Sequence, residues 1–307
     1  MTALGDKWKN RYCRTSTHDM AAARLTYPRR RNTPLEIKRK VDRLKLKQAW
    51  GHRHLTIFLV RREIEQRYRG SALGLFWILL SSLLMLGIYT FVFNVIFVSR
   101  WPGMQADRVE VFAIVLFAGL SMYTLASECW SRATSLVTDN ATYVTKVVFP
   151  VELLPLVVVL ASLVQFAANF LIVIIASLVV LGAPSSTAIS FLVVLVPFVI
   201  LVLGGTYLLA FAGVFIRDMR MIVPFVLTAL LYLSPVLYPV QNTPVSIRYL
   251  FDLNPLSFFF EAARGALFFD QWPSLGGIAV AWLISLTVFG LGFYVFHRGA
   301  RAFADVL

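Results

Sequence analysis

The chain has 307 residues, of which 58% are hydrophobic, and its mean hydropathy of +0.73 excludes an ordinary soluble domain. Its net charge of +13 would suit a nucleic-acid-binding protein, but 19 of the 29 lysines and arginines lie before residue 71. Basic residues gathered beside apolar segments are typical of the cytoplasmic side of a membrane protein. The distribution of charge therefore argues against nucleic acid as a partner.

Residues 1–50 form a basic extension that precedes every apolar run. A signal peptide places its apolar core within about the first 30 residues, so the sequence predicts no cleavable signal peptide. Near the end of the extension, Ile37, Val41 and Leu44 fall on one helical stripe surrounded by lysines and arginines. This pattern predicts a basic amphipathic helix on anionic lipids of the inner leaflet, with a solvated charged helix as an equally good alternative.

Residues 52–69 predict a second amphipathic helix, with an apolar stripe that holds Ile57, Val60, Ile64 and Tyr68. The segment is too short and too charged to cross a membrane, so we expect it in the interface, where it leads into the first span. Its arginines could bind a phosphate group through bidentate contacts, and simple anchoring at the inner leaflet is the alternative. These candidates for a substrate pyrophosphate are Arg61, Arg62, Arg67 and Arg69.

Six apolar runs follow, each long enough, or nearly so, to cross the roughly 30 Å hydrocarbon core as an α-helix. They lie at about residues 73–98, 111–136, 152–181, 189–216, 220–239 and 274–297. The predicted fold is therefore an all-α integral membrane protein with six transmembrane helices. The positive-inside rule places the basic N-terminus, and with six spans also the C-terminus, in the cytoplasm.

Several residues inside the spans are candidates for packing or for transport. Glu128 and Arg132 stand four residues apart in the second span, where a structural ion pair is a better interpretation than a functional site. Glycines are expected to allow close helix contacts, namely Gly74, Gly87, Gly204 and Gly205. Aromatic residues of the first and fifth spans could stack on sugar rings in a channel, with ordinary packing or lipid contact as the alternative. They are Tyr89, Phe93, Tyr232 and Tyr238.

A polar segment, NATYVTKVVFPVELLP at residues 140–155, interrupts the apolar runs on the predicted cytoplasmic side. Its pattern predicts a short amphipathic helix, which Pro150 ends. Tyr143 and Val147 lie on the apolar side, and Asn140 and Lys146 offer polar contacts. A short amphipathic helix in a cytoplasmic loop has one good physical use, which is to dock into a groove on a soluble partner.

The segment at residues 241–272 is not a simple loop. It contains an Asn-Pro step at Asn254 and Pro255, followed by a phenylalanine-rich run with Glu261 and Arg264. The segment is too apolar for an exposed loop and too broken for a span. We expect a pair of short re-entrant or interfacial helices on the outer side, because irregular backbone at membrane depth must be buried in protein or line water.

Common catalytic and nucleotide-binding motifs are absent from the sequence. It has no GxxxxGK[ST] phosphate loop, no GxSxG and no HExxH, and its two cysteines lack metal-type spacing. Six helices without such a site indicate a pathway driven from elsewhere, with no cofactor or metal bound by this chain. A multi-spanning glycosyl or acyl transferase is the alternative from another class, and it would need convergent Asp, Glu or His residues at the interface.

Four motifs follow one another in the order YRGSALGLFW, ECWSRATSLVTDNATYVTKVVFPVELLP, VFIRDMRMIVPFVLTALLYLSPVLYP and NPLSFFFEAARGAL. Over about residues 50–300 the chain thereby resembles the type-2 ABC exporter permeases of the polysaccharide and O-antigen export family (Wzm-like, with capsule and teichoic-acid relatives). The resemblance implies a homodimeric permease in the bacterial inner membrane, joined by two copies of a separate ATPase that binds ATP and Mg. Its cargo would be an undecaprenyl-pyrophosphate-linked glycan. An exporter of another lipid or of a drug is the alternative within the family.

The resemblance also implies roles for particular segments of a six-span domain at residues 51–307. Residues 139–148 would form the coupling helix that enters a cleft on the ATPase. The interfacial helix would flank a lateral entrance for the lipid pyrophosphate, and the first and fifth spans would border the channel. The contact residues for the ATPase would be Asn140, Tyr143, Lys146, Val147 and Phe149, and those of an outer gate would be Asn254, Pro255, Phe258 and Glu261.

One position departs from the family pattern. A basic residue usually follows the Phe-Pro step in this family, whereas Val151 stands there in this chain. The resemblance therefore implies no ion-pair role at that position, and it implies no role for the long basic extension.

Overall fold

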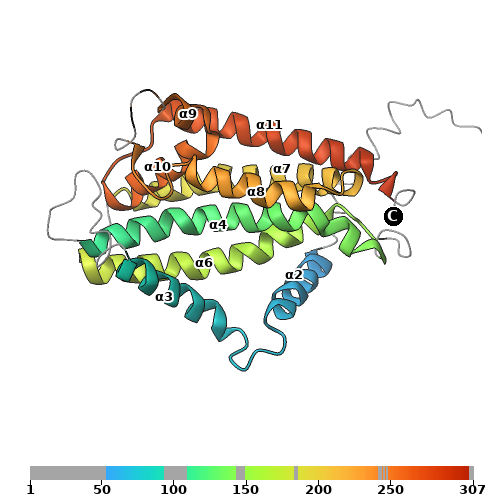
Figure 1. Ribbon diagram of the computed structural model, residues 1–307, viewed down its shortest axis with the longest axis horizontal. Helices are drawn as coiled ribbons and strands as arrows, with labels where there is room; N and C mark the ends of the chain where they lie inside the picture. The colour runs from blue at the N-terminus through green and yellow to red at the C-terminus, as the bar shows by residue number, and fades with distance from the viewer. Residues whose placement is uncertain are drawn as a thin grey trace, which may run out of the picture. The chain divides into compact units, whose positions relative to one another are not determined.

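The computed structural model describes residues 53–92, 109–142, 149–182, 186–240, 244, 246 and 248–303. Over these residues the chain consists of helices and connecting turns, without strands, which confirms the predicted all-α class (Figure 1). The predictions for the extension of residues 1–50 and for Phe93, Tyr143, Lys146 and Val147 lie outside the described residues.

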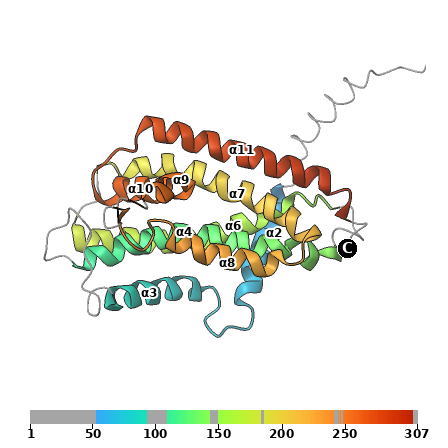
Figure 2. The same ribbon diagram turned by 45° about the horizontal axis from the view of Figure 1, so that its top comes forward.

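Four long apolar helices lie side by side in the structure (Figures 1 and 2). They are α4 (Val109–Asp139), α6 (Leu153–Leu181), α7 (Phe191–Phe215), which follows the 3-10 turn η2 (Ala188–Ser190), and α11 (Leu275–Gly299). The 25 residues of α11 rise about 37 Å, which exceeds the roughly 30 Å hydrocarbon core. All four are long and apolar enough to cross a membrane, and the most apolar part of α4 is 78% buried, against 17% for α11. The protein is thus a multi-pass membrane protein with α4 at the centre of its packing.

Two shorter apolar helices, α3 (Phe76–Phe91) and α8 (Met219–Tyr232), lie where the first and fifth spans are expected. Their 16 and 14 residues rise only about 24 and 21 Å. The end of α8 has a local cause, because Pro235 has no N–H for the carbonyl of Leu231 and disfavours helical geometry at the preceding residue. The chain continues beyond Tyr232 as turns and irregular backbone over residues 233–239.

Glycines bring α7 close to its neighbours. A methyl group on Gly204 would meet the backbone nitrogen of Phe289 in α11 at 2.5 Å, and one on Gly292 would collide with the carbonyl of Gly204. On the other side, a methyl group on Gly205 would lie 2.5 Å from the indole nitrogen of Trp130 in α4. Small residues at these points therefore allow α7 to approach the backbone of α11 and the indole of Trp130 closely.

The prediction of close helix contacts holds for two of the four glycines. Close helix approach is confirmed at Gly204 and Gly205, as the contacts above demonstrate. The prediction is wrong for Gly87, which has no neighbouring atom within 4 Å of an added methyl group, and for Gly74, which lies in a turn with φ +51°. Within the part of the chain that the structure describes, Gly74 and Gly87 thus do not pack helices together.

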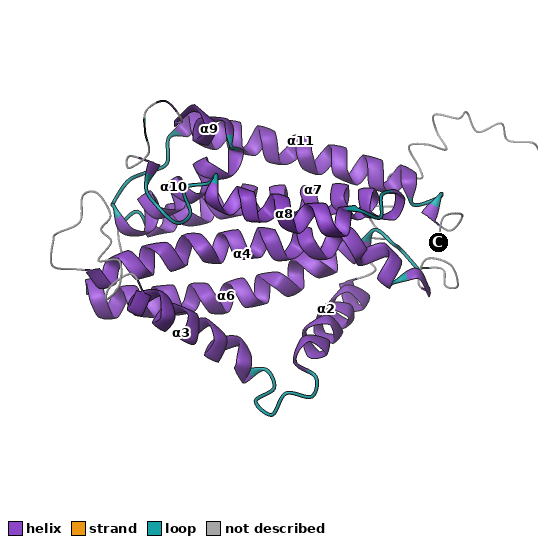
Figure 3. Cartoon of the chain, in the orientation of Figure 1, coloured by secondary structure: helices purple, strands orange, loops and turns teal. Residues whose placement is uncertain are grey.

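The helix α2 (Arg53–Tyr68) is followed by a turn that leads into α3 (Figure 3). In this turn the φ of Gly70 is +85°, a conformation that residues with a Cβ rarely adopt. The bend lies between the helix expected in the membrane interface and the first expected span. It sets α2 at an angle to α3, so that the two helices diverge from the turn (Figure 1).

Two short helices, α9 (Arg248–Leu253) and α10 (Pro255–Phe268), precede α11. The start of α10 is defined by Asn254, whose side-chain oxygen accepts a hydrogen bond from the backbone N–H of Leu256 at 3.0 Å. Pro255 occupies the first helical position, where a missing N–H costs nothing. The helix α10 packs against α7 and α4 and buries Phe259 and Phe260.

Candidate functional site

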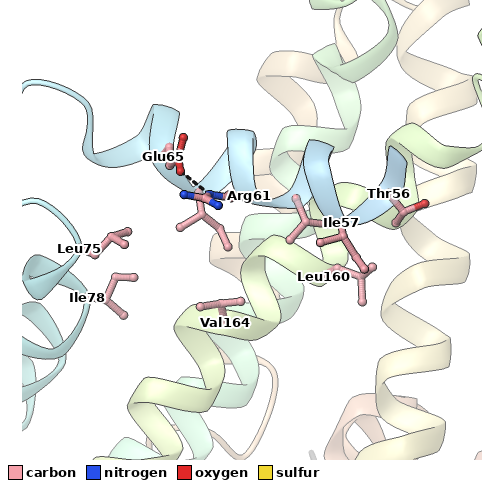
Figure 4. Close-up of a pocket in the computed structure, with 10 residues that line it drawn as sticks. Thr56, Ile57, Arg61, Glu65, Leu75, Ile78, Leu160 and Val164 are labelled. Atoms are coloured by element: carbon pink, nitrogen blue, oxygen red, sulfur yellow. Dashed lines mark hydrogen bonds and ion pairs between the residues drawn. The ribbon is translucent and has the colours of Figure 1, made fainter. Parts of the chain in front are cut away.

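An open groove of about 620 Å³ lies between α2, the start of α3 and α6 (Figure 4). Its walls are mostly apolar: α2 contributes Ile57, Val60 and Ile64, and the facing elements contribute Leu75, Ile78, Leu160 and Val164. Three members of the apolar stripe predicted for α2 thus line one surface. A groove of this kind, open to the side of the helices, can hold a flexible hydrocarbon chain.

The ion pair between Arg61 and Glu65 provides most of the polar lining of the groove (Figure 4). Arg61 Nε lies 2.7 Å from Glu65 Oε1, and both side chains are exposed. The hydrogen bond and the charge of Glu65 raise the pKa of Arg61, so the guanidinium keeps its charge. Exposed ion pairs contribute little to stability, and Arg61 can therefore exchange Glu65 for another anion.

The four candidate arginines do not form one cluster. Arg61 lines the groove, whereas Arg67 turns toward the interior, where it pairs with Glu128 of α4 and donates from Nη2 to Ser162 of α6 at 3.1 Å. Arg62 is half-buried, and Arg69 is exposed just after the end of α2. The contacts of Arg67 are those of a structural residue, while Arg61 has the accessible position that a ligand phosphate requires.

A cluster of charges, which we call the α2–α4 charge cluster, joins the two helices through Glu63, Arg67, Glu128 and Arg132. Arg132 pairs with Glu63 of α2 and lies 3.8 Å from Glu128, and Glu128 in turn pairs with Arg67. The structural interpretation of Glu128 and Arg132 is supported by these contacts. The two partners on α2 escaped the sequence analysis, because helical spacing identifies neighbours within one helix only.

A second polar group links α2, α3 and α6 within the apolar part of the structure. Tyr68 donates to Gln165 Oε1 at 2.9 Å, and Gln165 Nε2 donates to Ser82 and to Asn169, each at 3.1 Å. Ser82 completes the group by a hydrogen bond to Asn169. Burial raises the pKa of the Tyr68 phenol, so it remains a donor at neutral pH. The sequence does carry a sign of this group, since Gln165 and Asn169 are two amides, four residues apart, in a mostly apolar run.

The segment predicted to dock on a partner follows directly from α4. Asn140 donates from its side chain to the carbonyl of Leu136 at 2.8 Å, which continues the helix end. Arg220, at the start of α8, lies 3.6 Å from Asp139 and ties the ends of the two helices together. Phe149 is half-buried and packs against the hydrophobic core, so its side chain supports the segment from within.

The candidate channel aromatics separate into two groups. Tyr89 packs in the contact between α3 and α4, with its ring centroid 6.3 Å from that of Phe117, as the packing alternative predicts. Tyr238 donates from its hydroxyl to the carbonyl of Tyr232, and its ring meets Phe251 edge-on at 6.1 Å. Tyr232 itself is exposed. The structure therefore brings Tyr232 and Tyr238 together but leaves Tyr89 elsewhere.

The candidate outer-gate residues lie in the first half of α10 or directly before it. Asn254 caps the helix and Pro255 starts it, while the ring of Phe258 packs edge-on against Phe259 at 5.9 Å. Glu261 is exposed. The same helix carries Arg264, which is 3% exposed and whose burial the sequence did not predict.

Among the described residues, no group of three or more His, Cys, Asp or Glu side chains is placed to hold a metal ion. The described region thus has three polar or ligand-sized features. They are the apolar groove with the ion pair of Arg61, the α2–α4 charge cluster, and the contact between the ends of α4 and α8.

Comparison with known proteins identifies the family. Residues 54–268, more than half of the chain, match the profile of the ABC-2 type transporter family. The O-antigen export system permease protein RfbA of Myxococcus xanthus is 28% identical over 267 residues, which cover 85% of this chain and 98% of the relative. Two proteins of the same description from Klebsiella pneumoniae are 22% and 25% identical over 266 and 269 residues, 86% of this chain and 99% of each relative. The resemblance drawn from the motifs is confirmed, and the chain belongs to the ABC-2 type transporter family as a membrane permease rather than a catalytic subunit.

Proposed function

We propose that this chain is the permease subunit of an ABC exporter that moves a lipid-linked polysaccharide, such as O-antigen or a similar cell-surface glycan, across the bacterial inner membrane. The observation that carries the proposal is the likeness to O-antigen export permeases over 98–99% of their length. A likeness of that extent supports a shared arrangement of helices and not merely a shared motif.

In this proposal two copies of the chain form the pathway, and two copies of an ATPase supply the energy by binding ATP and Mg. Each copy contributes six spans, with α3 and α8 as the core of the first and fifth, and both termini face the cytoplasm. Anionic lipids of the inner leaflet attract the basic residues before residue 71. The helix α8 suits a channel wall, because a helix that ends within the membrane leaves room for irregular, water-lining backbone.

The coupling helix of the proposal is the segment that begins at Asp139. Its position is supported by the continuous run of α4 into it and by the contact between Arg220 and Asp139. A movement of the ATPase would thereby be transmitted to both α4 and α8. We assign Tyr143 and Lys146 as the residues that enter the ATPase cleft.

Replacing Tyr143 and Lys146 by alanine should uncouple the exporter. The doubly substituted chain should fold and reach the membrane, because its apolar helices are unchanged, but it should lose most of its ATPase partner and of its glycan export. Co-purification in mild detergent and surface glycan staining measure the two effects. Gly276→Ala, which adds a methyl group with no atom within 4 Å, is the control. Unchanged export by the double variant would count against the coupling helix.

The groove between α2, α3 and α6 is the proposed lateral entrance for the undecaprenyl chain. Its apolar walls match the hydrocarbon of the lipid, and Arg61 stands at the polar lining where a pyrophosphate would lie. Because Arg67 is bound to Glu128, we propose Arg61 as the first contact, with Arg62 and Arg69 close in the sequence as secondary contacts. Tyr232 and Tyr238 are the proposed sugar contacts further along the path.

Removing the charge of Arg61 should weaken the stimulation of ATP hydrolysis by the lipid-linked substrate. For Arg61→Gln we expect the substrate concentration for half-maximal stimulation to rise about fivefold, since one charge-assisted contact to phosphate is lost. Arg61→Lys should recover only part, because an ammonium cannot form the bidentate contact. Arg301→Gln, an exposed charge at the other end of the chain, is the matched control. If Arg61→Gln and Arg301→Gln required the same substrate concentration for half-maximal stimulation, Arg61 would serve only to anchor α2 at the inner leaflet.

The first experiment is purification of the tagged chain from its native membrane in mild detergent, with mass identification of the proteins and lipids that accompany it. A nucleotide-binding subunit in equal amount, together with a polyprenyl-linked glycan, would establish the polysaccharide exporter. The same subunit with another lipid or a drug would favour the alternative within the family. A clean chain without an ATPase would contradict the proposal and favour a membrane transferase.

A further inference from the structure

The chain after α8 is buried although it is not helical. Ser234 and Val236 are fully buried, and the backbone between them is turned so that the N–H of Val236 bonds to the carbonyl of Ser234 at 2.7 Å. Because Pro235 interrupts the helix, the carbonyls of this segment have no partner in a regular ladder. Buried carbonyls need donors, and the donors must come from elsewhere.

Side chains on the other side of the turn supply those donors. The Arg264 guanidinium of α10 donates from Nη1 to the carbonyl of Pro235 and from Nη2 to that of Val236. Asn254 donates from Nδ2 to Ser234 Oγ at 2.7 Å and to the carbonyl of Leu233 at 3.3 Å. A planar guanidinium presents two parallel donors, so it fits two successive carbonyls as a lysine could not.

A third helix holds the guanidinium in place. Gly119 of α4 faces Arg264, and a methyl group on Gly119 would collide with Nη2. The absence of a side chain at this point therefore gives Arg264 its position between α4 and the irregular segment. The guanidinium of Arg264 thus connects α10 with the segment after α8 and lies against α4.

We propose that Arg264 and Asn254 form a latch that joins α10 to the irregular end of α8 and keeps the outer end of the pathway closed at rest. The inference rests on the proposed function, in which α8 borders the channel, and on the outer gate that the resemblance implies for the residues of α10. Arg264 acts as a positioning residue, because it holds the backbone of residues 233–236 and does not itself contact cargo. Opening of the exit then requires α10 to move together with the end of α8 or the latch to break.

The latch can be tested by amide hydrogen exchange of residues 233–238 in the purified full chain in lipid nanodiscs. Arg264→Lys keeps the charge but loses the pair of parallel N–H donors. Asn254→Asp keeps the oxygen that caps α10 but loses the N–H that donates to Ser234. Gly119→Ala displaces the guanidinium without altering it, and Gly276→Ala, with no atom near the added methyl group, is its control. We expect about tenfold faster exchange of residues 233–238 in the first three variants, and no change in the control.

The role at the gate has its own readout, which is the number of ATP molecules hydrolysed per glycan exported. This ratio should rise at least threefold in Arg264→Lys, whatever the change in unfolding temperature, whereas a merely structural contact would lower the unfolding temperature and leave the ratio alone. Wild-type exchange in folded Arg264→Lys and Asn254→Asp would overturn the latch, and faster exchange with an unchanged ratio would overturn its role at the gate. A chain without an ATPase partner would overturn the proposed function instead, and the exchange comparison would still decide on the latch.

Discussion

Glu128→Lys is expected to destabilise the protein by about 3–5 kcal/mol and to release α2 from α4. Glu128 lies between Arg67 and Arg132, and the side chains of Glu128 and Arg67 are only 27% and 17% exposed. A lysine would place three cations together at a site that is only partly exposed to water. The unfolding temperature of the purified chain in detergent measures the loss of stability, and amide exchange along α2 measures its release.

The exposed ion pair on the same helix provides the matched control. Glu65→Lys also reverses one carboxylate of an ion pair with arginine, but both partners are largely exposed, so the unfolding temperature should hardly change. Combining Glu128→Lys with Arg67→Glu should recover part of the stability, because one of the two pairs is restored in reverse. Equal unfolding temperatures for Glu65→Lys and Glu128→Lys would show that the α2–α4 charge cluster contributes no more than a surface pair.

This charge cluster also has a consequence for transport. The helix α2 forms one wall of the groove, and α4 runs directly into the segment proposed to contact the ATPase. A cluster that ties α2 to α4 therefore places the proposed entrance and the proposed coupling segment on one mechanical unit. In complexes that contain variants with a released α2, ATP hydrolysis by the partner ATPase is expected to respond more weakly to substrate.

Much of the helical framework could be predicted because it depends on local patterns. Long apolar runs predict membrane helices, since each backbone must satisfy its own hydrogen bonds in lipid. The short helices before α11 followed from the Asn-Pro step at Asn254 and Pro255, which both caps and starts α10. The extent of α8 was harder to foresee. Its apolar run continues past Tyr232, and Pro235 ends the helix within that run.

The contacts between helices could not be read from spacing. Arg61 and Arg67 look alike in the sequence, yet one lines the groove and the other pairs with Glu128, because the partner lies 61 positions further along the chain. The same limit explains Arg264, whose burial depends on carbonyls in another segment and on Gly119 in a third. Glycines present the same difficulty, since Gly87 and Gly204 differ only in what faces them.

Gly290 and Gly292 lie two positions apart in α11, and alanine at these two positions is expected to have opposite effects on stability. Gly292→Ala should lower the stability of the protein by about 1–3 kcal/mol, because the added methyl group meets the carbonyl of Gly204 and the backbone on both sides must separate. Gly290→Ala adds the same atom to the same helix in open space, and the better helix propensity of alanine should stabilise it by up to about 1 kcal/mol. Unfolding temperatures in detergent compare the two variants directly.

The contact at stake is the most extensive between any two described helices, that of α7 with α11. If Gly204→Ala is combined with Gly292→Ala, the losses should not add, since the first methyl group already forces the helices apart. A Gly292→Ala chain as stable as Gly290→Ala would mean that α7 and α11 lie further apart than the structure places them. The expected loss would instead support the close approach of Gly292 to the backbone of α7.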